Sequence, residues 1–181
     1  AITIDMGLGM DYSGIEAMCR ELDVPYSIIK TEIAPIIFDY RKEKNPCSMC
    51  AKMRRGALNQ ALLDRGLNKL ALGHHFDDVI ETTLMGMMYG AQIQGMLPKL
   101  HSTNFEGMEL IRPLYMVRES FIKDWARYNE LKFLQCACRF TEKIEEEKGS
   151  YVKTSKRQET KELIAHYRKI NPVIEANIFR S

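Results

Sequence analysis

Two pairs of cysteines are the residues best suited to bind a metal. Cys47 and Cys50 form a C-x-x-C pair at the predicted start of a helix, where exposed amides and the helix dipole favour thiolates. Cys136 and Cys138 form a tighter C-x-C pair, so one of these two thiolates is expected not to reach the metal. Three thiolates suit a 4Fe-4S cluster with one open iron, and four suit zinc or a fully ligated cluster. The plainer alternative is incidental buried cysteines, as we expect for Cys19.

Two histidines and two aspartates form a second polar cluster, His74, His75, Asp77 and Asp78, between a predicted strand and a predicted helix. At the carboxyl end of a strand, such groups can hold Mg²⁺ and nucleotide phosphates. The competing interpretation is a helix N-cap at Asp77, which is worth about 1 kcal/mol. A cap explains one aspartate but not the whole cluster, so the pattern favours a functional site.

Basic residues gather in two further places. Arg54 and Arg55 lie one turn beyond Cys50. They are either ordinary solvated helix residues or residues that contact a phosphoryl group or an RNA phosphate. The C-terminal segment is also basic, which predicts RNA contacts, although an amphipathic helix packing through Leu163, Ile164 and Tyr167 is an equal alternative. Its basic residues are Lys153, Lys156, Arg157, Lys161, Arg168 and Lys169, against Glu159 and Glu162.

Strands and helices alternate along the chain. This alternation predicts an α/β fold with a mostly parallel sheet and helices on both faces. We expect a catalytic domain over residues 1–140 and a charged, mainly helical tail over 141–181. The expected strands are 1–5, 26–31, 69–72 and 110–112. The first expected helix opens at a Ser13–Glu16 capping box, the second follows Cys50 and ends near Gly66, and the third runs from about Val79 to Tyr89. The fourth carries Phe121, Ile122, Trp125 and Ala126 on an apolar face, and the last runs from a Ser155–Gln158 cap to Arg168.

Composition restricts the class of protein. With 45% hydrophobic and 28% charged residues in 181, the chain is typical of a globular protein. Its apolar runs are far shorter than the roughly 18 residues that span a bilayer, and no signal peptide is visible. Five cysteines, an odd number, favour metal ligation in a reducing compartment over a disulfide framework, so a cytoplasmic location is expected.

Three segments taken together resemble the tRNA 2-thiocytidine synthetase family, within the PP-loop ATP pyrophosphatases. They are Pro46-Cys-Ser-Met-Cys-Ala-Lys-Met-Arg-Arg-Gly56, Leu70-Ala-Leu-Gly-His-His-Phe-Asp-Asp-Val-Ile-Glu-Thr82 and Ile111-Arg-Pro-Leu114. The resemblance implies an adenine-nucleotide α-hydrolase-like, Rossmann-like fold, a homodimer, and ATP- and Mg²⁺-dependent 2-thiolation of cytidine 32 in the tRNA anticodon loop. It also implies a sulfur donor such as a cysteine desulfurase.

The resemblance assigns roles to individual residues. Cys47, Cys50 and Cys136, with Cys138 as the alternative third ligand, would hold the 4Fe-4S cluster. Asp78 matches the family's catalytic acidic position, beside Asp77. The remaining implied residues are Arg54 for catalysis, Asp5, Gly73, His74 and His75 for nucleotide binding, and Arg55, Lys99, Lys156 and Arg157 for RNA binding.

The sequence departs from the family pattern at two points. The pyrophosphate-binding S-G-G-K-D-S loop, expected one strand upstream of Ile4, is absent from this sequence, so we expect the chain to begin inside the second strand of the domain. The second departure is C-x-C in place of P-C-x-x-C. Two rival functions are thiolation of another tRNA base by the same chemistry, and a non-catalytic zinc protein that binds RNA.

Overall fold

The computed structural model describes residues 1–42, 46–133 and 156–181. The described residues form two compact units, each treated by itself below. The first contains residues 1–70 and 104–108, and the second contains 71–103, 109–133 and 156–181. Cys136, Cys138, Lys153 and the domain boundary expected near residue 140 lie outside the described residues, so these expectations stay predictions.

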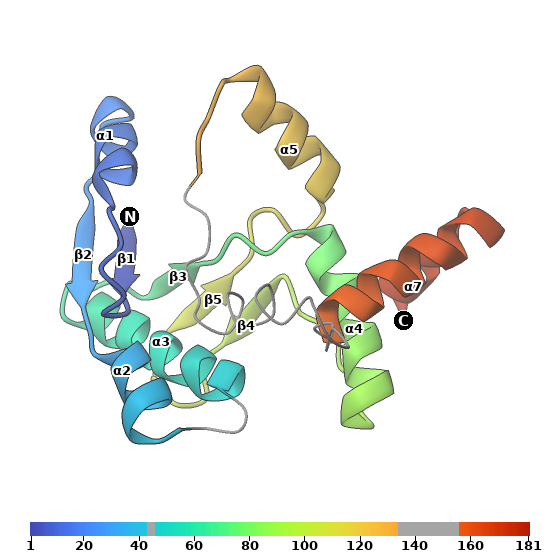
Figure 1. The fold of residues 1–181 in the computed structure, drawn as a ribbon, viewed down its shortest axis with the longest axis horizontal. Coiled ribbons are helices and arrows are strands. Elements are labelled where there is room, and N and C mark those ends of the chain that lie inside the picture. Colours follow the sequence, from blue (N-terminus) through green and yellow to red (C-terminus); the bar gives the residue numbers. More distant parts are fainter. Residues whose placement is uncertain (43–45, 134–155) are drawn as a thin grey trace. The chain divides into compact units, whose positions relative to one another are not determined.

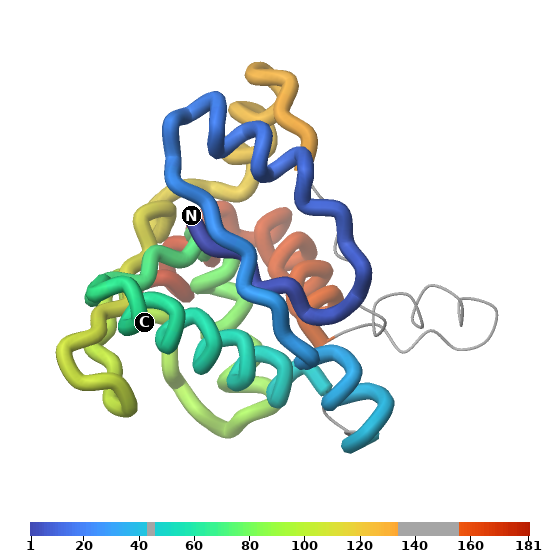
Figure 2. Tube along the Cα trace, turned by 90° about the vertical axis from the view of Figure 1, so that its left-hand side faces the viewer, coloured from blue at the N-terminus to red at the C-terminus, as the bar shows by residue number. Residues whose placement is uncertain are grey.

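The first unit contains a parallel pair of strands. Strand β1 (Ile2–Asp5) lies beside β2 (Ser27–Lys30), with Thr3 opposite Ile28, and the two run together in blue in Figure 2. Helix α1 (Ser13–Glu21) connects them, as a parallel pairing requires a crossover. The expected strand–helix–strand order is therefore confirmed.

The start of α1 differs from expectation. No side chain caps the helix at Tyr12, so the predicted Ser13–Glu16 capping box is wrong. Asp11 instead orders the chain just before the helix, because its carboxylate accepts hydrogen bonds from the Ser13 N–H at 2.9 Å and from the Ser13 hydroxyl at 3.0 Å. Helix α1 has no buried residue, so Cys19 is half-buried rather than in the core.

The other helices of the first unit are α2 (Ile33–Pro35), the π-helical turn η1 (Ile36–Tyr40) and α3 (Pro46–Leu63). After α3 the chain reverses at Gly66, whose φ of 64° favours glycine, as expected for a helix end. The buried residues of these elements include Ile33, Ala34, Ile37, Ala61 and Leu62, which places an apolar core between the helices.

A three-stranded sheet has the order β3-β5-β4, from β3 (Lys69–Ala71), β4 (Lys99–His101) and β5 (Glu109–Ile111). Strand β4 was not predicted, and it pairs antiparallel with β5, with Leu100 opposite Leu110. The expectation of a mostly parallel sheet is thus confirmed for β1–β2 and wrong for β4–β5. The short connection between β4 and β5 explains this, since adjacent antiparallel strands need no crossover.

Helix α4 (Phe76–Gly90) packs against α7 (Lys156–Ile170), beside which it lies in Figure 1, and also against α8 (Ile174–Arg180). Phe76 and Ile80 of α4 form a buried cluster with Ile164 of α7. The Phe76 ring also stacks on Phe179 of α8, with centroids 4.4 Å apart. The C-terminal helices therefore anchor to the helix that follows the His–Asp cluster.

Helix α5 (Glu119–Tyr128) exposes the face that was expected to pack. Ala126 is buried, but the Phe121 and Trp125 side chains are largely exposed. Their helical periodicity was recognised correctly, while their burial was not. None of the helices in the described part of the chain combines the length and apolarity needed to cross a membrane.

Candidate active site

The His–Asp cluster forms a capped turn between β3 and α4. The His75 ring accepts a hydrogen bond from the Asp78 N–H at 3.4 Å, and the Asp78 carboxylate accepts one from the His75 N–H at 3.1 Å. This reciprocal pair is a capping box, so the cap is His75 and not Asp77, and α4 begins at Phe76. Helix capping thus accounts for part of the motif that the sequence assigned to catalysis.

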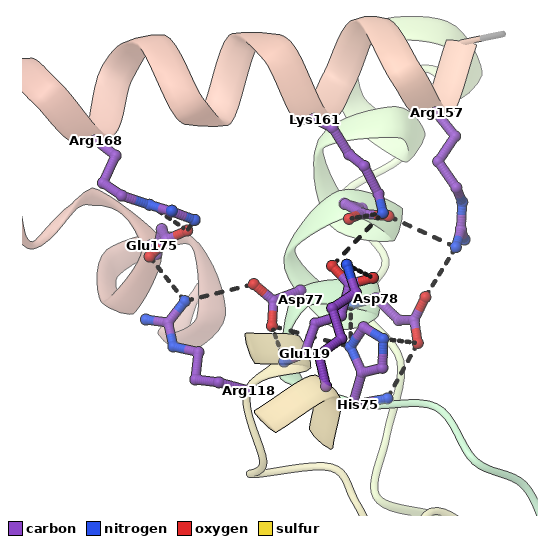
Figure 3. A network of polar contacts seen from close by, with 11 residues as sticks. His75, Asp77, Asp78, Arg118, Glu119, Arg157, Lys161, Arg168 and Glu175 are labelled. Atoms are coloured by element: carbon purple, nitrogen blue, oxygen red, sulfur yellow. Dashed lines mark hydrogen bonds and ion pairs between the residues drawn. The ribbon is translucent and has the colours of Figure 1, made fainter. Parts of the chain in front are cut away.

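Asp77 faces the start of α5. Its carboxylate accepts a hydrogen bond from the Glu119 N–H at 2.7 Å and lies 3.6 Å from the Arg118 guanidinium. Arg118 covers the Phe76 ring at 4.1 Å and also pairs with Glu175 of α8 at 2.7 Å. Figure 3 shows this chain of contacts continuing to Arg168 of α7. Asp77 therefore helps to join three helices.

Asp78 faces α7 as well as its own helix cap. Its Oδ1 accepts a hydrogen bond from Arg157 at 2.8 Å, while its Oδ2 accepts the His75 N–H (Figure 3). Burial raises the pKa of Asp78, but the His75 N–H and the neighbouring His75 and Arg157 charges outweigh it and hold the pKa below its usual value. Asp78 is therefore a carboxylate at neutral pH, and a cation that binds at Oδ1 would compete with Arg157.

Glu81, one turn further along α4, is a buried acid that sequence reasoning gave no role. Only 3% of its surface is exposed, and it lies 3.5 Å from Arg157 and 3.6 Å from Lys161. Burial raises its pKa despite these two cations. Its position three residues after Asp78 was the available signal, because residues at that spacing share a helix face.

His74 precedes the cap and is partly buried. Burial lowers its pKa first, and the nearby Arg112 charge lowers it further, so the ring is neutral at neutral pH. Its Nδ1 is buried with no hydrogen-bond partner among the described residues. This buried nitrogen is not accessible to a substrate, so the nucleotide-binding role of His74 stays a prediction. Gly73 beside it is exposed.

The cysteine pair lies in the first turn of α3, as expected. Cys47 is exposed, and Cys50 is half-buried with its Sγ 4.0 Å from the Met6 sulfur. Their i, i+3 spacing puts both thiols on one side of the helix start, which fits two ligand positions of an iron–sulfur cluster. Within residues 1–42, 46–133 and 156–181, no three His, Cys, Asp or Glu side chains form a metal site.

Arg54 and Arg55 are exposed on α3, one turn after Cys50. Asp5, at the end of β1, accepts hydrogen bonds from the Gly7 N–H at 3.0 Å and the Tyr12 hydroxyl at 3.4 Å. Gly7 has a φ of 78°, and a Cβ there would lie 3.1 Å from the Thr31 carbonyl oxygen. Asp5 therefore shapes a tight loop that requires glycine.

Three of the predicted RNA-binding cations have partners within the second unit. Lys99 lies 2.7 Å from Glu109, and the Lys156 amine lies 4.7 Å from the centre of the Tyr89 ring. Arg157 bridges the two acids of α4 described above. Their RNA-binding role stays a prediction, because an ion pair on an accessible side chain can be exchanged for a phosphate.

The structure thus gathers the predicted residues into two groups. Cys47, Cys50, Arg54, Arg55 and Asp5 belong to the first unit. The His–Asp residues, Lys99, Lys156 and Arg157 belong to the second, and there Arg157 joins Asp78. Sequence reasoning missed Arg118, Glu119 and Glu175, which come together only because α5 and α8 meet at the start of α4.

Several known proteins are similar in sequence to this chain. A tRNA-cytidine(32) 2-sulfurtransferase of Coxiella burnetii is 35% identical over 179 residues, covering 96% of this chain and 64% of that protein. One of Janthinobacterium is 40% identical over 119 residues, covering 65% of this chain and 36% of that protein. The chain thus spans less than two thirds of the curated relatives it matches.

A solved structure has the same fold. The U34-tRNA thiolase NcsA from Methanococcus maripaludis, with its [4Fe-4S] cluster, matches with a TM-score of 0.74 and 24% identity over 99% of this chain and 59% of that one. This match confirms the expected adenine-nucleotide α-hydrolase-like fold. A family model described as the PP-loop domain matches residues 2–144. With its motifs, its fold and this match in agreement, the chain belongs to the PP-loop domain family.

Proposed function

We propose that this chain acts in an ATP-dependent tRNA sulfurtransferase that thiolates cytidine 32 of the anticodon loop. The observation that carries the proposal is the Asp77–Asp78 pair, held by a capping box at the start of α4 among arginine side chains. Carboxylates with cations beside them suit phosphoryl chemistry, in which Mg²⁺ and guanidinium groups stabilise developing negative charge. The similarity to tRNA-cytidine(32) 2-sulfurtransferases supports the choice of substrate.

The proposed reaction has two steps. The oxygen at C2 of the cytosine attacks the α-phosphate of ATP, which forms a C–O–P linkage and releases pyrophosphate. Sulfur delivered as sulfide then adds at C2, and AMP leaves with the oxygen. Activation of this kind is needed because an oxygen bound directly to C2 is a poor leaving group.

The residues of this chain divide between the two steps. We assign Asp78 to Mg²⁺ or proton handling in adenylation, with Asp77 beside it and Arg54 near the reacting groups. His74 and His75, with Gly73 and Asp5, would contact the nucleotide. Cys47 and Cys50, with Cys136 or Cys138 as the third ligand, would hold a 4Fe-4S cluster, which supplies a binding place for the transferred sulfur.

The same proposal includes the remaining partners. tRNA would bind through exposed cations such as Arg55, Lys99, Lys156 and Arg157, by neutralising phosphates. A cysteine desulfurase type of donor, a homodimeric assembly and a cytoplasmic location complete it.

The test uses anaerobically purified full-length protein. We expect a brown protein that contains iron and converts cytidine 32 to 2-thiocytidine when ATP, Mg²⁺, a sulfide source and tRNA are supplied, measured by mass spectrometry of digested RNA. A colourless zinc protein that binds RNA without thiolating it would favour the non-catalytic alternative. Thiolation at another position, such as the U34 named for the structural relative, would leave the chemistry and change the substrate.

A further inference from the structure

A cavity of about 720 Å³ lies beside the second half of α4, within the second unit. One wall is a stripe of α4 that includes Thr82, Met85, Gly86 and Tyr89. The opposite wall is the segment after the helix, residues 92–97. The volume falls in the range of about 300–1,000 Å³ that is usual for small-molecule sites, so it is large enough for a nucleotide.

Glycines allow the two walls to meet. Helix α4 ends at Gly90, the next residue Ala91 has a φ of 51°, and the Gln92 N–H then donates back to the Gly86 carbonyl at 3.1 Å. A Cβ at Gly86 would lie only 2.9 Å from the Gln92 carbonyl oxygen. Gly86 therefore lets the chain fold back against α4, and any larger residue would push this wall away.

Hydrogen bonds from β5 and the loop after it fix the outer wall. The Tyr115 hydroxyl donates to the Met96 carbonyl at 2.9 Å, and the Arg112 N–H donates to the Pro98 carbonyl at 2.9 Å. The Arg112 guanidinium also donates to the Leu97 carbonyl. Because three carbonyl groups in succession are held, the cavity is formed before a ligand arrives.

The lining has the chemistry of a site for a planar heterocycle. Methionine and leucine side chains and the Tyr89 ring provide apolar contact, which suits the faces of a ring. Gln92 and Gln94 are exposed and carry amides, which can donate to and accept from the polar edge of a base. None of the described lining residues is acidic, and Arg112 is basic, so the lining suits a neutral ring with a phosphate nearby rather than a cation.

Position connects the cavity to the candidate active site. Thr82 lies four residues after Asp78, and residues at that spacing occupy the same side of a helix. Arg112 lines the cavity and also lies close enough to His74 to affect its charge. Lys156, over the Tyr89 ring, and Lys99, after the outer wall, add positive charge where an RNA backbone would pass.

We propose that this cavity holds an unstacked nucleobase of the RNA substrate, placed beside the His–Asp turn, an inference that rests on the proposed function. Single-stranded loops are recognised in this way, by stacking of a splayed-out base and hydrogen bonds to its edge. The adenine of ATP shares this chemistry and is the competing occupant.

The test fills the cavity and removes the base in turn. The RNA is an anticodon stem-loop in which each loop nucleotide is replaced by an abasic one, and binding is measured with full-length protein. Met85→Trp fills the cavity, whereas Met87→Trp, on the same helix at an exposed position outside the lining, is the matched control. Gln92→Ala with Gln94→Ala is a second variant that leaves the helix unchanged, with exposed Gln60→Ala as its control.

We expect wild-type protein and Met87→Trp to lose roughly tenfold or more in affinity when one particular loop base is removed. Met85→Trp should bind the intact RNA as weakly as the wild type binds that abasic RNA. The affinity of Met85→Trp should then be the same for the intact and the abasic RNA. The glutamine variant should show the same loss of discrimination to a smaller extent. Thermal unfolding of each variant checks that it folds.

Two results would overturn the inference. One is an equal abasic penalty in wild-type protein, Met85→Trp and the glutamine variant. The other is that Met85→Trp weakens the affinity for ATP, measured by equilibrium dialysis, and leaves RNA binding unchanged, which would assign the cavity to adenine. Thiolation of the same stem-loop separates this inference from the proposed function: base-dependent binding without 2-thiocytidine would leave the cavity assignment standing and reject the reaction.

Discussion

The turn at the start of α3 and the turn at the start of α4 both carry side chains that can bind metals, but they hold these side chains differently. The cysteine turn presents one exposed thiol and one half-buried thiol beside a thioether. The His–Asp turn is closed by a capping box, and its two carboxylates are joined to α5 and α7. We call the cysteine turn open, because Cys47 is exposed, and the His–Asp turn closed, because its carboxylates contact α5 and α7.

The largest effect should follow from removing the open turn's thiols. Cys47→Ala or Cys50→Ala should abolish iron binding and thiolation, because the proposed function makes each thiol a ligand of the cluster and alanine has no atom that binds iron. Iron content and the visible spectrum after anaerobic purification measure this, and Cys19→Ala is the control. A brown, active Cys47→Ala protein would mean that this turn is not the cluster site.

The second effect concerns the closed turn. Asp78→Asn should lower thiolation by about a hundredfold or more, because an amide cannot bind Mg²⁺ or a proton as a carboxylate does. It should cost at most about 1 kcal/mol of unfolding free energy, since an asparagine oxygen still accepts the His75 N–H. Single-turnover thiolation and urea unfolding measure the two quantities, with exposed Asp124→Asn as the control.

If Asp78→Asn turned over like the wild type, the motif would be a helix cap and nothing more. If it unfolded the protein instead, the loss of activity would be structural. Iron content should be unchanged in a folded Asp78→Asn protein, because Cys47 and Cys50 belong to the other unit.

The third comparison separates Arg157 from Lys156, both predicted to contact RNA. Lys156→Met should lower the slope of log affinity against log salt by about one unit, as for one phosphate contact. Arg157→Met should lower that slope by less than one unit, because a phosphate reaches Arg157 only in competition with Asp78 and Glu81, and should reduce the free energy of unfolding by less than about 1 kcal/mol. A drop of one unit for Arg157→Met would instead show that RNA phosphate displaces Asp78 as its partner.

The smallest expected effect is a pH dependence from Glu81. Its pKa is raised in the folded protein, so the folded state binds the proton more tightly, and stability falls as pH rises from the ordinary value of 4.5 through the folded pKa. Glu81→Gln should remove that fall and match or exceed the wild type at neutral pH, by about 1 kcal/mol or less. Urea unfolding at several pH values measures it. A Gln variant markedly less stable at neutral pH would show that the pairs with Arg157 and Lys161 outweigh burial.

Much of this organisation could be predicted from local sequence. Strands near 2–5, 27–30, 69–71 and 109–111, the long helix after Cys50 and the reversal at Gly66 follow from apolar periodicity and backbone preferences, which depend only on neighbouring residues. The order of the cysteine and His–Asp motifs was likewise enough to identify the PP-loop family. Local rules failed at the helix starts, where Ser13 forms no capping box and His75 caps α4 rather than Asp77, the alternative considered, because several nearby polar groups compete for the same amides.

Only the tertiary structure decided how the charges are used. Arg157 pairs with Asp78 across 79 residues, and Arg118 pairs with Glu175 across 57, contacts that no periodicity encodes. They exist because burial of Phe76, Ile80 and Ile164 brings α7 and α8 onto α4. The sequence alone therefore determined which residue types are available for chemistry, while packing of distant apolar side chains decided which carboxylates are paired, which are buried and which cavity lies beside them.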